Sequence, residues 1–304
     1  MLLVELLYKA KKSFIQFYKK YFTTEGTYTC ILPDKLYLKM LYKQRTGKTL
    51  NLKKPQNYSE KGNWLKLYNR QKEYTVMADK YEVKRYISDI LGEEYVVPII
   101  GTWDSPDDID FSSLPNEFVL KCNHDNGVII CRDKYKLDIA KTKEELKQRL
   151  NRNYYKKLRE WPYKNIQRKI ICEKYMYPPI NEDPLDYKMF CFNGKVKIIA
   201  VCTNRYNGCA MEDYYTVDWK HIDAFKKPQR GDVYNPPPCL NEMMVLAEKL
   251  SENIPFLRVD FNVWKNNFTV GELTFFNYGC MLPFNEPWET KLGEWIELPK
   301  KHRR

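Results

Sequence analysis

Two carboxylates, Asp260 and Glu272, stand on the two β-rich arms of the segment RVDFNVWKNNFTVGELT, residues 258–274. If residues 265–267 form a three-residue hairpin loop, counting outward from it places Asp260 directly opposite Glu272. Side chains that face each other across a sheet lie about 5 Å apart at Cβ, so two acids there need a nearby cation or a raised pKa. Mg²⁺ prefers hard oxygen ligands and is commonly completed by nucleotide phosphates. The hairpin therefore predicts a magnesium site that takes a phosphorylated ligand.

The same register sorts the hairpin into an apolar and a polar face. It pairs Trp264 with Phe268 and Asn262 with Val270. A two-residue loop would instead slip the register and put the acids on opposite faces. A solvated acid pair beside Arg258 is the other interpretation that the hairpin alone leaves open. Because side chains alternate along a strand, the predicted apolar face holds Val259, Phe261, Val263, Gly271, Leu273 and Phe275, and the polar face holds Arg258, Asp260, Asn262, Glu272 and Thr274.

The composition limits the kinds of partner. A chain of 304 residues is long enough for one large domain or for two to three lobes. Its 51 basic and 39 acidic residues give a net charge of +12, which favours anionic partners such as nucleotides, acidic polymers or a membrane surface. The charge is scattered along the chain, so nucleic acid is not expected as a partner. Nine cysteines form no CxxC pair and no signal peptide is recognised, which predicts a reducing cytoplasmic location.

The first 22 residues favour an amphipathic helix. Acidic and basic residues interrupt the segment too often for it to span a bilayer. Two interpretations remain: a basic helix in peripheral contact with the inner, cytoplasmic membrane, or a helix packed on the protein's own core. The stripe that would face membrane or core consists of Leu3, Leu7, Phe14, Phe17 and Tyr21.

The remaining pattern predicts a mixed α and β chain without strict βαβ alternation. Helices are expected over residues 34–46, with a stop at Gly47, and after Tyr58. A further helix ends at Gly92, and another begins at a capping box of Thr142 and Glu145. Strands are expected at 95–103, 118–122, 128–131 and 170–176, followed by a hairpin turning at Asn193-Gly194, a helix at 241–254 and the hairpin described above.

Five segments, listed below in chain order, resemble the motifs of the ATP-grasp superfamily. Their residues are similar to those of its TupA-like branch, named for teichuronopeptide biosynthesis. The resemblance covers roughly residues 75–298. It implies an α+β ATP-grasp fold, with two α+β lobes, 76–170 and 171–304, that clasp a nucleotide, and a helical N-terminal extension, 1–75. The five segments are ADKYEVKRYI, FVLKCNHDNG, IICEKYM, DYKMFCFNGKVK, and RVDF through GELTFFNYG.

The resemblance also implies which residues contact ATP. Lys80 and Lys121 match the lysines that reach the phosphates, as compact positive charges suited to that task. The turn from Asn123 to Gly127 matches the phosphate flap, whose backbone N–H groups bind phosphate oxygens, and Gly127 allows close approach. Asp125 departs from the family pattern and is expected to point away from the phosphates. The other implied contacts are His124 in the flap and Glu173, Lys174 and Met176 at the hinge that holds the nucleoside.

The metal and catalytic residues follow in the same way. Asp260 and Glu272 match the magnesium ligands, and Thr274 stands where many relatives carry asparagine. Two expectations are open for that place: Asn277 supplies the amide instead, or a water fills it. Lys188, Arg205 and Arg258 resemble the basic residues that face the transferred phosphate and the acyl phosphate.

The implied reaction is ATP-dependent ligation. ATP phosphorylates a carboxylate, and an amine attacks the resulting acyl phosphate to leave an amide, ADP and phosphate. ATP and Mg²⁺ are the implied cofactors. Because the TupA-like branch is linked with acidic cell-surface polysaccharides such as capsule, the implied substrates are a uronic-acid carboxylate and an amino acid or other amine.

Three alternatives compete with the ligase. A glycosyltransferase of capsule or lipopolysaccharide synthesis would use a Rossmann-like half and an acid cluster, for which Asp107, Asp108 and Asp110 are candidates. A non-catalytic membrane-associated scaffold would depend on residues 1–22. A nucleic-acid binder would use the 15% aromatic residues and the positive charge.

Overall fold

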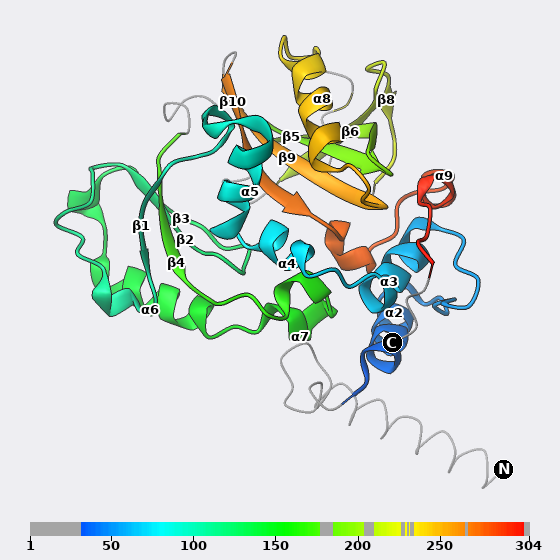
Figure 1. Cartoon of the computed structure of the whole chain (residues 1–304), viewed down its shortest axis with the longest axis horizontal. Helices are drawn as coiled ribbons and strands as arrows, with labels where there is room; N and C mark the ends of the chain where they lie inside the picture. The colour runs from blue at the N-terminus through cyan, green and yellow to red at the C-terminus, as the bar shows by residue number, and fades with distance from the viewer. Residues whose placement is uncertain are drawn as a thin grey trace, which may run out of the picture.

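Two antiparallel sheets, of four and six strands, lie side by side with helices around them (Figure 1). The computed structural model describes residues 32–176, 185–203, 210–225, 229, 231, 234–264 and 267–300. The helix predicted over residues 1–22 lies outside these ranges. Within them, no helix is long and apolar enough to cross a membrane. The α+β class predicted from the sequence is confirmed.

In the described part of the chain, four α-helices precede the first strand. The helix ends predicted at Gly47 and Gly92 are both found. Gly47 has a left-handed φ of 72°, a conformation that commonly ends a helix at glycine. The Asn57 side chain accepts a hydrogen bond from the backbone N–H of Glu60 and so caps the second helix. The last two helices contact strand β10 and lie along the junction of the sheets. The four are α2 (Asp34–Thr46), α3 (Tyr58–Tyr68), α4 (Glu73–Ala78) and α5 (Glu82–Leu91).

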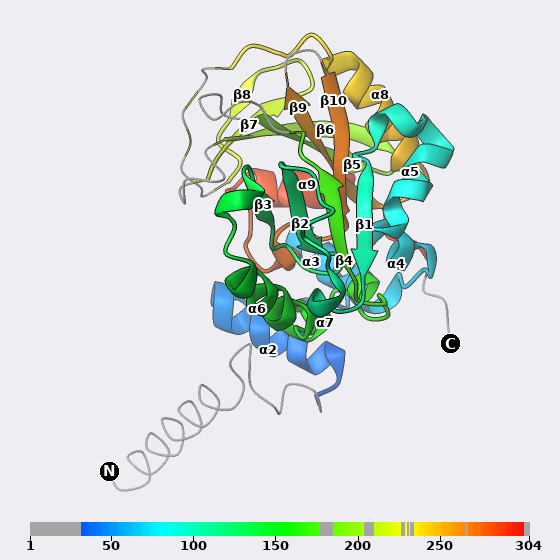
Figure 2. The same cartoon turned by 90° about the vertical axis from the view of Figure 1, so that its left-hand side faces the viewer.

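The four-stranded sheet has the order β1-β4-β2-β3 (Figure 2). Helix α6 (Ile139–Leu150) packs on it through buried Leu146. The Asp138 side chain caps this helix by accepting from the Lys141 N–H, so the predicted start at Thr142 is wrong. Helix α7 (Tyr154–Leu158) leads back toward β4. The strands are β1 (Ile99–Trp103), β2 (Phe118–Cys122), β3 (Ile129–Cys131) and β4 (Ile170–Lys174).

The six-stranded sheet has the order β10-β9-β5-β6-β7-β8. Its β5–β6 hairpin turns at Asn193 and Gly194, with φ of 47° and 76°, which confirms the predicted two-residue turn. Helix α8 (Leu240–Leu250) packs against β5, β6 and β9. The strands are β5 (Leu185–Phe192), β6 (Lys195–Thr203), β7 (Met211–Thr216), β8 (His221–Ile222), β9 (Phe256–Trp264) and β10 (Asn267–Thr274).

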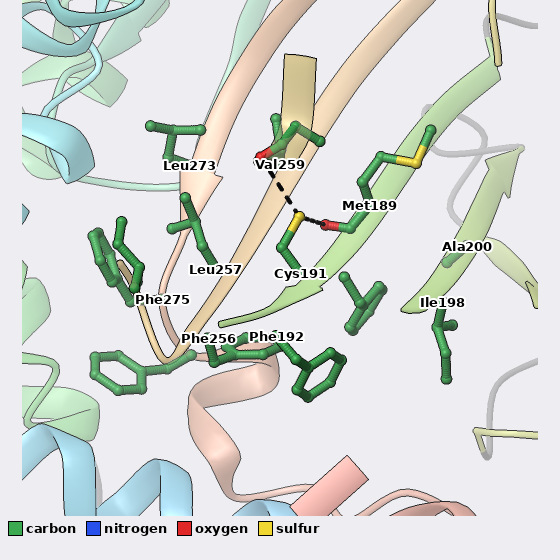
Figure 3. Close-up of a cluster of buried hydrophobic side chains, with 14 of the residues drawn as sticks. Met189, Cys191, Phe192, Ile198, Ala200, Phe256, Leu257, Val259, Leu273 and Phe275 are labelled. Carbon is green, nitrogen blue, oxygen red and sulfur yellow. Dashed lines mark hydrogen bonds between the residues drawn. The ribbon is translucent and has the colours of Figure 1, made fainter. Parts of the chain in front are cut away.

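The core of this sheet is built by alternating side chains of its central strands (Figure 3). Met189 and Cys191 from β5 and Leu257 and Val259 from β9 are all fully buried. The Cys191 thiol lies 3.7 Å from the backbone oxygens of Met189 and Ala247, as a small, weakly donating core group. This packing fixes β5 and β9 side by side and therefore fixes the polar side chains on their opposite face.

Helix α9 (Trp288–Trp295) ties the end of the chain to the N-terminal helices. Buried Glu289 accepts hydrogen bonds from the N–H groups of Ser59 (2.8 Å) and Phe284 (2.9 Å). Its carboxylate thus satisfies an N–H in the first turn of α3, where negative charge is favoured. Short 3₁₀ turns complete the fold: η2 (Glu93–Tyr95), η3 (Pro106–Asp108), η4 (Lys134–Lys136), η5 (Trp161–Tyr163) and η6 (Asn277–Cys280).

The loop end of the β9–β10 hairpin differs from the prediction. Trp264 pairs with Asn267, so two residues connect the strands where three were predicted. Both pairs predicted near the loop, Trp264 with Phe268 and Asn262 with Val270, are therefore wrong. A shift of this kind would by itself put the two acids on opposite faces, because side chains alternate along each strand.

A β-bulge at Gly271 restores the register. The pairing shifts between Val270 and Glu272, and beyond it Asp260 stands opposite Glu272 as predicted. Val270 takes the place on the buried face that was predicted for Gly271, and Gly271 instead lines cavities on the polar side. The extra residue of the bulge compensates for the residue missing from the loop.

The contact between α9 and the loop before α3 leaves no room for a side chain at Gly293. A Cβ built there would lie 2.4 Å from the backbone oxygen of Gln56 and 2.5 Å from backbone atoms of Asn57. Gly293→Ala is expected to lower the free energy of unfolding by about 2 kcal/mol, because backbone must move to admit the methyl group. Urea unfolding measures this, with exposed Glu294→Ala on the same helix as the control. Equal stability of the two variants would contradict the packing described.

Candidate active site

Three adjoining cavities lie between the sheets. The narrow pocket, of about 30 Å³, has Lys84, Lys121, Glu173 and Met176 in its wall. The middle pocket, of about 270 Å³, has Lys80, Lys121, Gly127, Asp260 and Glu272 in its wall. The wide pocket, of about 630 Å³, has Lys188, Glu212, Arg258, Glu160 and Tyr278 in its wall, with Arg45 and Lys157 among its basic residues.

Shared residues join the three pockets in a row. Lys121 and Gly271 line both the narrow and the middle pocket. Lys80 and Glu272 line both the middle and the wide pocket. Strands β2 and β4 supply one wall and the β9–β10 hairpin supplies the facing wall. Most of the predicted site residues thus line one continuous cleft, although they come from distant parts of the sequence. Asn123, His124 and Asn277 are not among its lining residues.

Glu173 forms the polar centre of the narrow pocket. Its carboxylate lies 2.5 Å from the Lys121 ammonium and 2.7 Å from that of Lys84. Burial alone would raise the pKa of Glu173, but the charges of Lys121 and Lys84 lower this pKa below its usual value. Lys174 and Met176 also line this pocket, and their role at a nucleoside hinge stays a prediction. Lys84 was not among the predicted residues, although its position one helical turn after Lys80 was a usable signal.

The position of Lys80 depends on its neighbour Asp79. The Asp79 carboxylate accepts from the N–H of Tyr81 at the start of α5 and from the Asn123 side-chain amide at 2.9 Å. The backbone N–H of Lys80 donates to the Asn123 carbonyl at 3.0 Å. This lock between α5 and the end of β2 aims the Lys80 ammonium at the middle pocket, 3.7 Å from Glu272.

Polar groups of the predicted flap, residues 123–127, are hydrogen-bonded to other groups of the protein. Asn123 is 1% exposed, and its side-chain oxygen also accepts from the Lys169 N–H. The His124 ring lies 3.0 Å from the Arg152 carbonyl, and burial lowers its pKa. Nucleotide contacts from these two side chains stay a prediction. The Gly127 N–H donates to the Asp125 carboxylate at 3.0 Å.

Asp125 is neutralised within the flap. Arg149 on α6 lies 3.3 Å from its carboxylate. A Cβ on Gly127 would collide with the Arg149 guanidinium, so glycine lets this arginine cross the turn. Phosphate binding through the Gly127 N–H therefore requires the Asp125 contact to open.

Arg258 lies at the centre of the predicted magnesium ligands. Its guanidinium binds both oxygens of Asp260 at 2.6 Å and donates to Glu272 at 3.1 Å. It also donates to the side-chain oxygens of Asn277 at 2.6 Å and Thr274 at 3.2 Å. A fork of N–H donors suits this bidentate pairing. The four predicted ligands are thus brought together, with a cation of the protein between them.

The side chains of Arg258, Asp260, Glu272 and Thr274 are called the floor of the cleft below. The pKa of Asp260 reflects the charges that surround it in this floor. Burial raises the pKa of Asp260, and Glu272 raises this pKa further, while Arg258 opposes both. Across the next strand pair, Lys188 stands in register with Asp260. The donor set fits Mg²⁺, which is commonly held by one or two carboxylates and completed by phosphate oxygens and water. In the stretches of chain that are described, no group of three acidic, histidine or cysteine side chains is placed to bind a metal without such help.

Lys188 and Glu212 occupy the wide pocket as a buried pair. Their charged atoms lie 3.1 Å apart. Glu212 also accepts hydrogen bonds from Tyr214 (2.8 Å) and Tyr278 (2.6 Å). Burial alone would lower the pKa of Lys188, but the Glu212 carboxylate helps to raise it above its usual value. Arg205, the other basic residue predicted for this part of the site, lies outside the described residues.

Solved structures of two ligases are distantly similar to this chain. A search of curated proteins gives no match. The D-alanine–D-alanine ligase from Bacillus anthracis complexed with ATP is 16% identical, with a TM-score of 0.39 over 66% of this chain and 54% of that chain. The L-amino acid ligase from Bacillus licheniformis is 13% identical, with a TM-score of 0.37 over 65% of this chain and 42% of that chain. The chain thus spans about half the length of these two proteins.

The family comparison covers most of the chain. The profile of the TupA-like ATP-grasp family matches residues 60–297, which include most of α3, helices α4 through α9, both sheets and every lining residue of the three pockets except Arg45. This range contains every predicted site residue. The chain therefore belongs to the TupA-like ATP-grasp family.

Proposed function

We propose that the protein is an ATP-dependent carboxylate–amine ligase that acts through an acyl phosphate. The observation that carries this is the row of three joined pockets. The narrow pocket is the nucleoside end, the middle pocket takes the phosphates and Mg²⁺, and the wide pocket takes the two substrates. On this proposal the γ-phosphate lies where the middle and wide pockets meet, beside Lys80 and Glu272, which line both pockets.

Charge placement supports this direction for the nucleotide. In the middle pocket, Lys80 and Lys121 are positioned to neutralise phosphate oxygens, and Asp260 and Glu272 to hold Mg²⁺. In the wide pocket, Lys188 and Arg258 face the place where an acyl phosphate would form. Chemistry of this kind depends on positioning and charge neutralisation more than on a protein nucleophile.

The wide pocket fits an acidic acceptor. Its volume of about 630 Å³ is that of a site for a ligand larger than one small metabolite. Arg45 and Lys157 stand in its wall in addition to the catalytic cations, and basic residues attract a carboxylate-bearing sugar. We therefore propose a uronic-acid carboxylate of an acidic cell-surface polysaccharide as one substrate and an amino acid as the other. The same proposal has the protein act in the cytoplasm, with residues 1–22 in peripheral contact with the membrane.

The structure does not favour the alternatives. Every strand pair within the two sheets is antiparallel over the described residues, so the Rossmann-like half that a glycosyltransferase would need is not found there. The side chain of Asp107, from the acid cluster named for that alternative, is 79% exposed and lines none of the three pockets. A scaffold or a nucleic-acid binder would leave the buried acids and cations of the cleft without a task.

The first test removes the metal ligands. Asp260→Asn and Glu272→Gln are each expected to lower magnesium-dependent ATP turnover by about 100-fold, because each removes a charged Mg²⁺ ligand. ADP release is measured with oligogalacturonate and a panel of amino acids as substrates. Asp107→Asn is the control and should match the wild type. ATP binding that ignores Mg²⁺, or full activity of both variants, would contradict the ligase.

A second test uses the competition between Arg258 and the metal. Arg258→Met is expected to lower the free energy of unfolding by about 3 kcal/mol, because it leaves Asp260 and Glu272 facing each other without the guanidinium that binds both. Mg²⁺ alone should then raise the melting temperature of this variant and hardly change that of the wild type. Arg70→Met, which breaks a 2.6 Å ion pair with Asp34 away from the cleft, is the control and should gain nothing from Mg²⁺. The same response in both variants would sink this assignment of the metal site.

A further inference from the structure

One acid of the wide pocket has no assigned task in binding ATP or Mg²⁺. Glu160 is 5% exposed and lines this pocket. Among the described residues, no hydrogen bond or ion pair to its carboxylate is found, in contrast to the other acids of the cleft. A buried carboxylate without a partner is costly, so its retention calls for a ligand that it can bind.

The backbone aims Glu160 into the pocket. The preceding residue, Arg159, is left-handed, with φ of 53°, and ends α7. Its side chain points to the other side, where it lies 3.1 Å from Asp34 and over the Tyr37 ring at 4.3 Å. A reversal between consecutive residues thus anchors one side chain to α2 and presents the next to the cavity.

Gly279 keeps the front of the Glu160 carboxylate open. This residue also lines the wide pocket and is left-handed, with φ of 60°. A Cβ there would lie 3.1 Å from a Glu160 oxygen. Glycine therefore leaves that oxygen within reach of a molecule in the pocket.

The charged groups around Glu160 come from four elements. The Tyr154, Tyr163 and Cys280 side chains also lie close enough for the Glu160 charge to raise their pKa values. Lys66 from α3 is the nearest in effect, but its ammonium is already bound to the backbone oxygens of Leu158 (3.0 Å) and Gly279. Arg258 from β9 is turned toward Asp260 and its neighbours. Lys157 from α7 adds a positive charge and Glu272 from β10 a negative one. Burial outweighs these charges and raises the pKa of Glu160 to about 7.

Glu212, the other acid of the wide pocket, is placed differently. It is held by Lys188, Tyr214 and Tyr278, and the Cys202 thiol lies 3.2 Å from it. These donors occupy the oxygens of Glu212, which leaves this carboxylate little capacity for a further ligand. Glu160 has no such donors, so it can accept both a hydrogen bond and a proton.

We propose that Glu160 receives the amine substrate: it binds the ammonium group and takes a proton from it as the amine attacks the acyl phosphate. This inference rests on the proposed ligase function and assigns the base of its second step. The new bond joins the amine nitrogen to the acyl carbon, and the bond from that carbon to the phosphate oxygen breaks. Of the two protons that the ammonium loses, one goes to Glu160 and one leaves with phosphate as hydrogen phosphate. A group that titrates near neutrality suits this task.

The test compares two nucleophiles in Glu160→Gln. Hydroxylamine is unprotonated at neutral pH and attacks an acyl phosphate without a base, giving a hydroxamate. The probe is oligogalacturonate with ATP, Mg²⁺, and either hydroxylamine or the panel amino acid that gives the highest ADP release with wild type. The variant is expected to keep hydroxamate formation within about twofold and to lose amino-acid-dependent turnover by about 100-fold. Formate, which can occupy the vacated space in Glu160→Ala, should recover part of the loss.

The outcomes separate this inference from the ligase function. Equal loss with both nucleophiles, or full turnover of Glu160→Gln with the amino acid, overturns the role of Glu160 and leaves the ligase standing. A wild type that yields neither hydroxamate nor ADP overturns both.

A second measurement needs no substrate. Between pH 4.5 and 7 the folded protein keeps the Glu160 proton that the unfolded chain has released, so this group makes folding less favourable as pH rises through that range. The urea midpoint of Glu160→Gln is expected to rise relative to wild type from pH 4.5 to 7 and to stay level above it. Glu117→Gln, at an exposed position, is the control and should track the wild type. A difference that does not change with pH would mean that the carboxylate has a counter-charge, which overturns the proposal.

Discussion

The fan of hydrogen bonds from the Arg258 guanidinium is the interaction on which the cleft depends. The β9–β10 pairing sets Asp260 opposite Glu272, and α8 and the central strands close the other face, so neither strand can turn its acids elsewhere. Without a cation between them, the two acids would repel across a few ångströms in a region with little water. The guanidinium supplies that cation and ties the floor to Asn277 at the start of η6. Arg258 therefore holds the floor in one geometry, and on the proposed function this is the geometry that Mg²⁺ meets when it binds.

The same arrangement recurs along the cleft. Lys121 and Lys84 neutralise Glu173, and Lys188 neutralises Glu212, each within 3.1 Å. On the proposed function, a nucleotide must exchange partners with these pairs, since its phosphates compete with the acids for the lysines. Mg²⁺ would make the exchange favourable, because it would take over the acids that the cations release. On this view, nucleotide and metal bind with mutual support, and neither is expected to bind strongly alone.

How much of this was predictable differs between residues. The alternation of β9 and β10 was enough to predict the opposed acids, and the family's motif order brought Lys80, Lys121 and Glu173 to the same cleft. The loop register was not predictable, since two compensating irregularities, a shorter loop and a bulge at Gly271, leave the distal pairing unchanged. The structural task of Asn123 was also hidden, because its partner Asp79 lies 44 residues away in sequence. The boundary predicted between the lobes likewise depends on pairing between distant segments. Strand β4 begins at Ile170 and pairs with β2, so a division at residue 171 falls within a strand of the four-stranded sheet.

The role of Glu160 could not be predicted from the sequence, where it is a single acid in an aromatic segment. Its environment is assembled from α3, α7, β9, β10 and η6, and only the left-handed turn at Arg159 decides which of two adjacent charges faces the cavity. Every other acid named in the cleft has a lysine or arginine within 4 Å. The chain has an excess of 12 positive charges, so a cation to pair with Glu160 would have been available. The Lys66 ammonium, however, donates its hydrogen bonds to backbone oxygens. The uncompensated position is therefore a property of the packing, and it leaves the wide pocket with one acid that a cationic substrate group can neutralise.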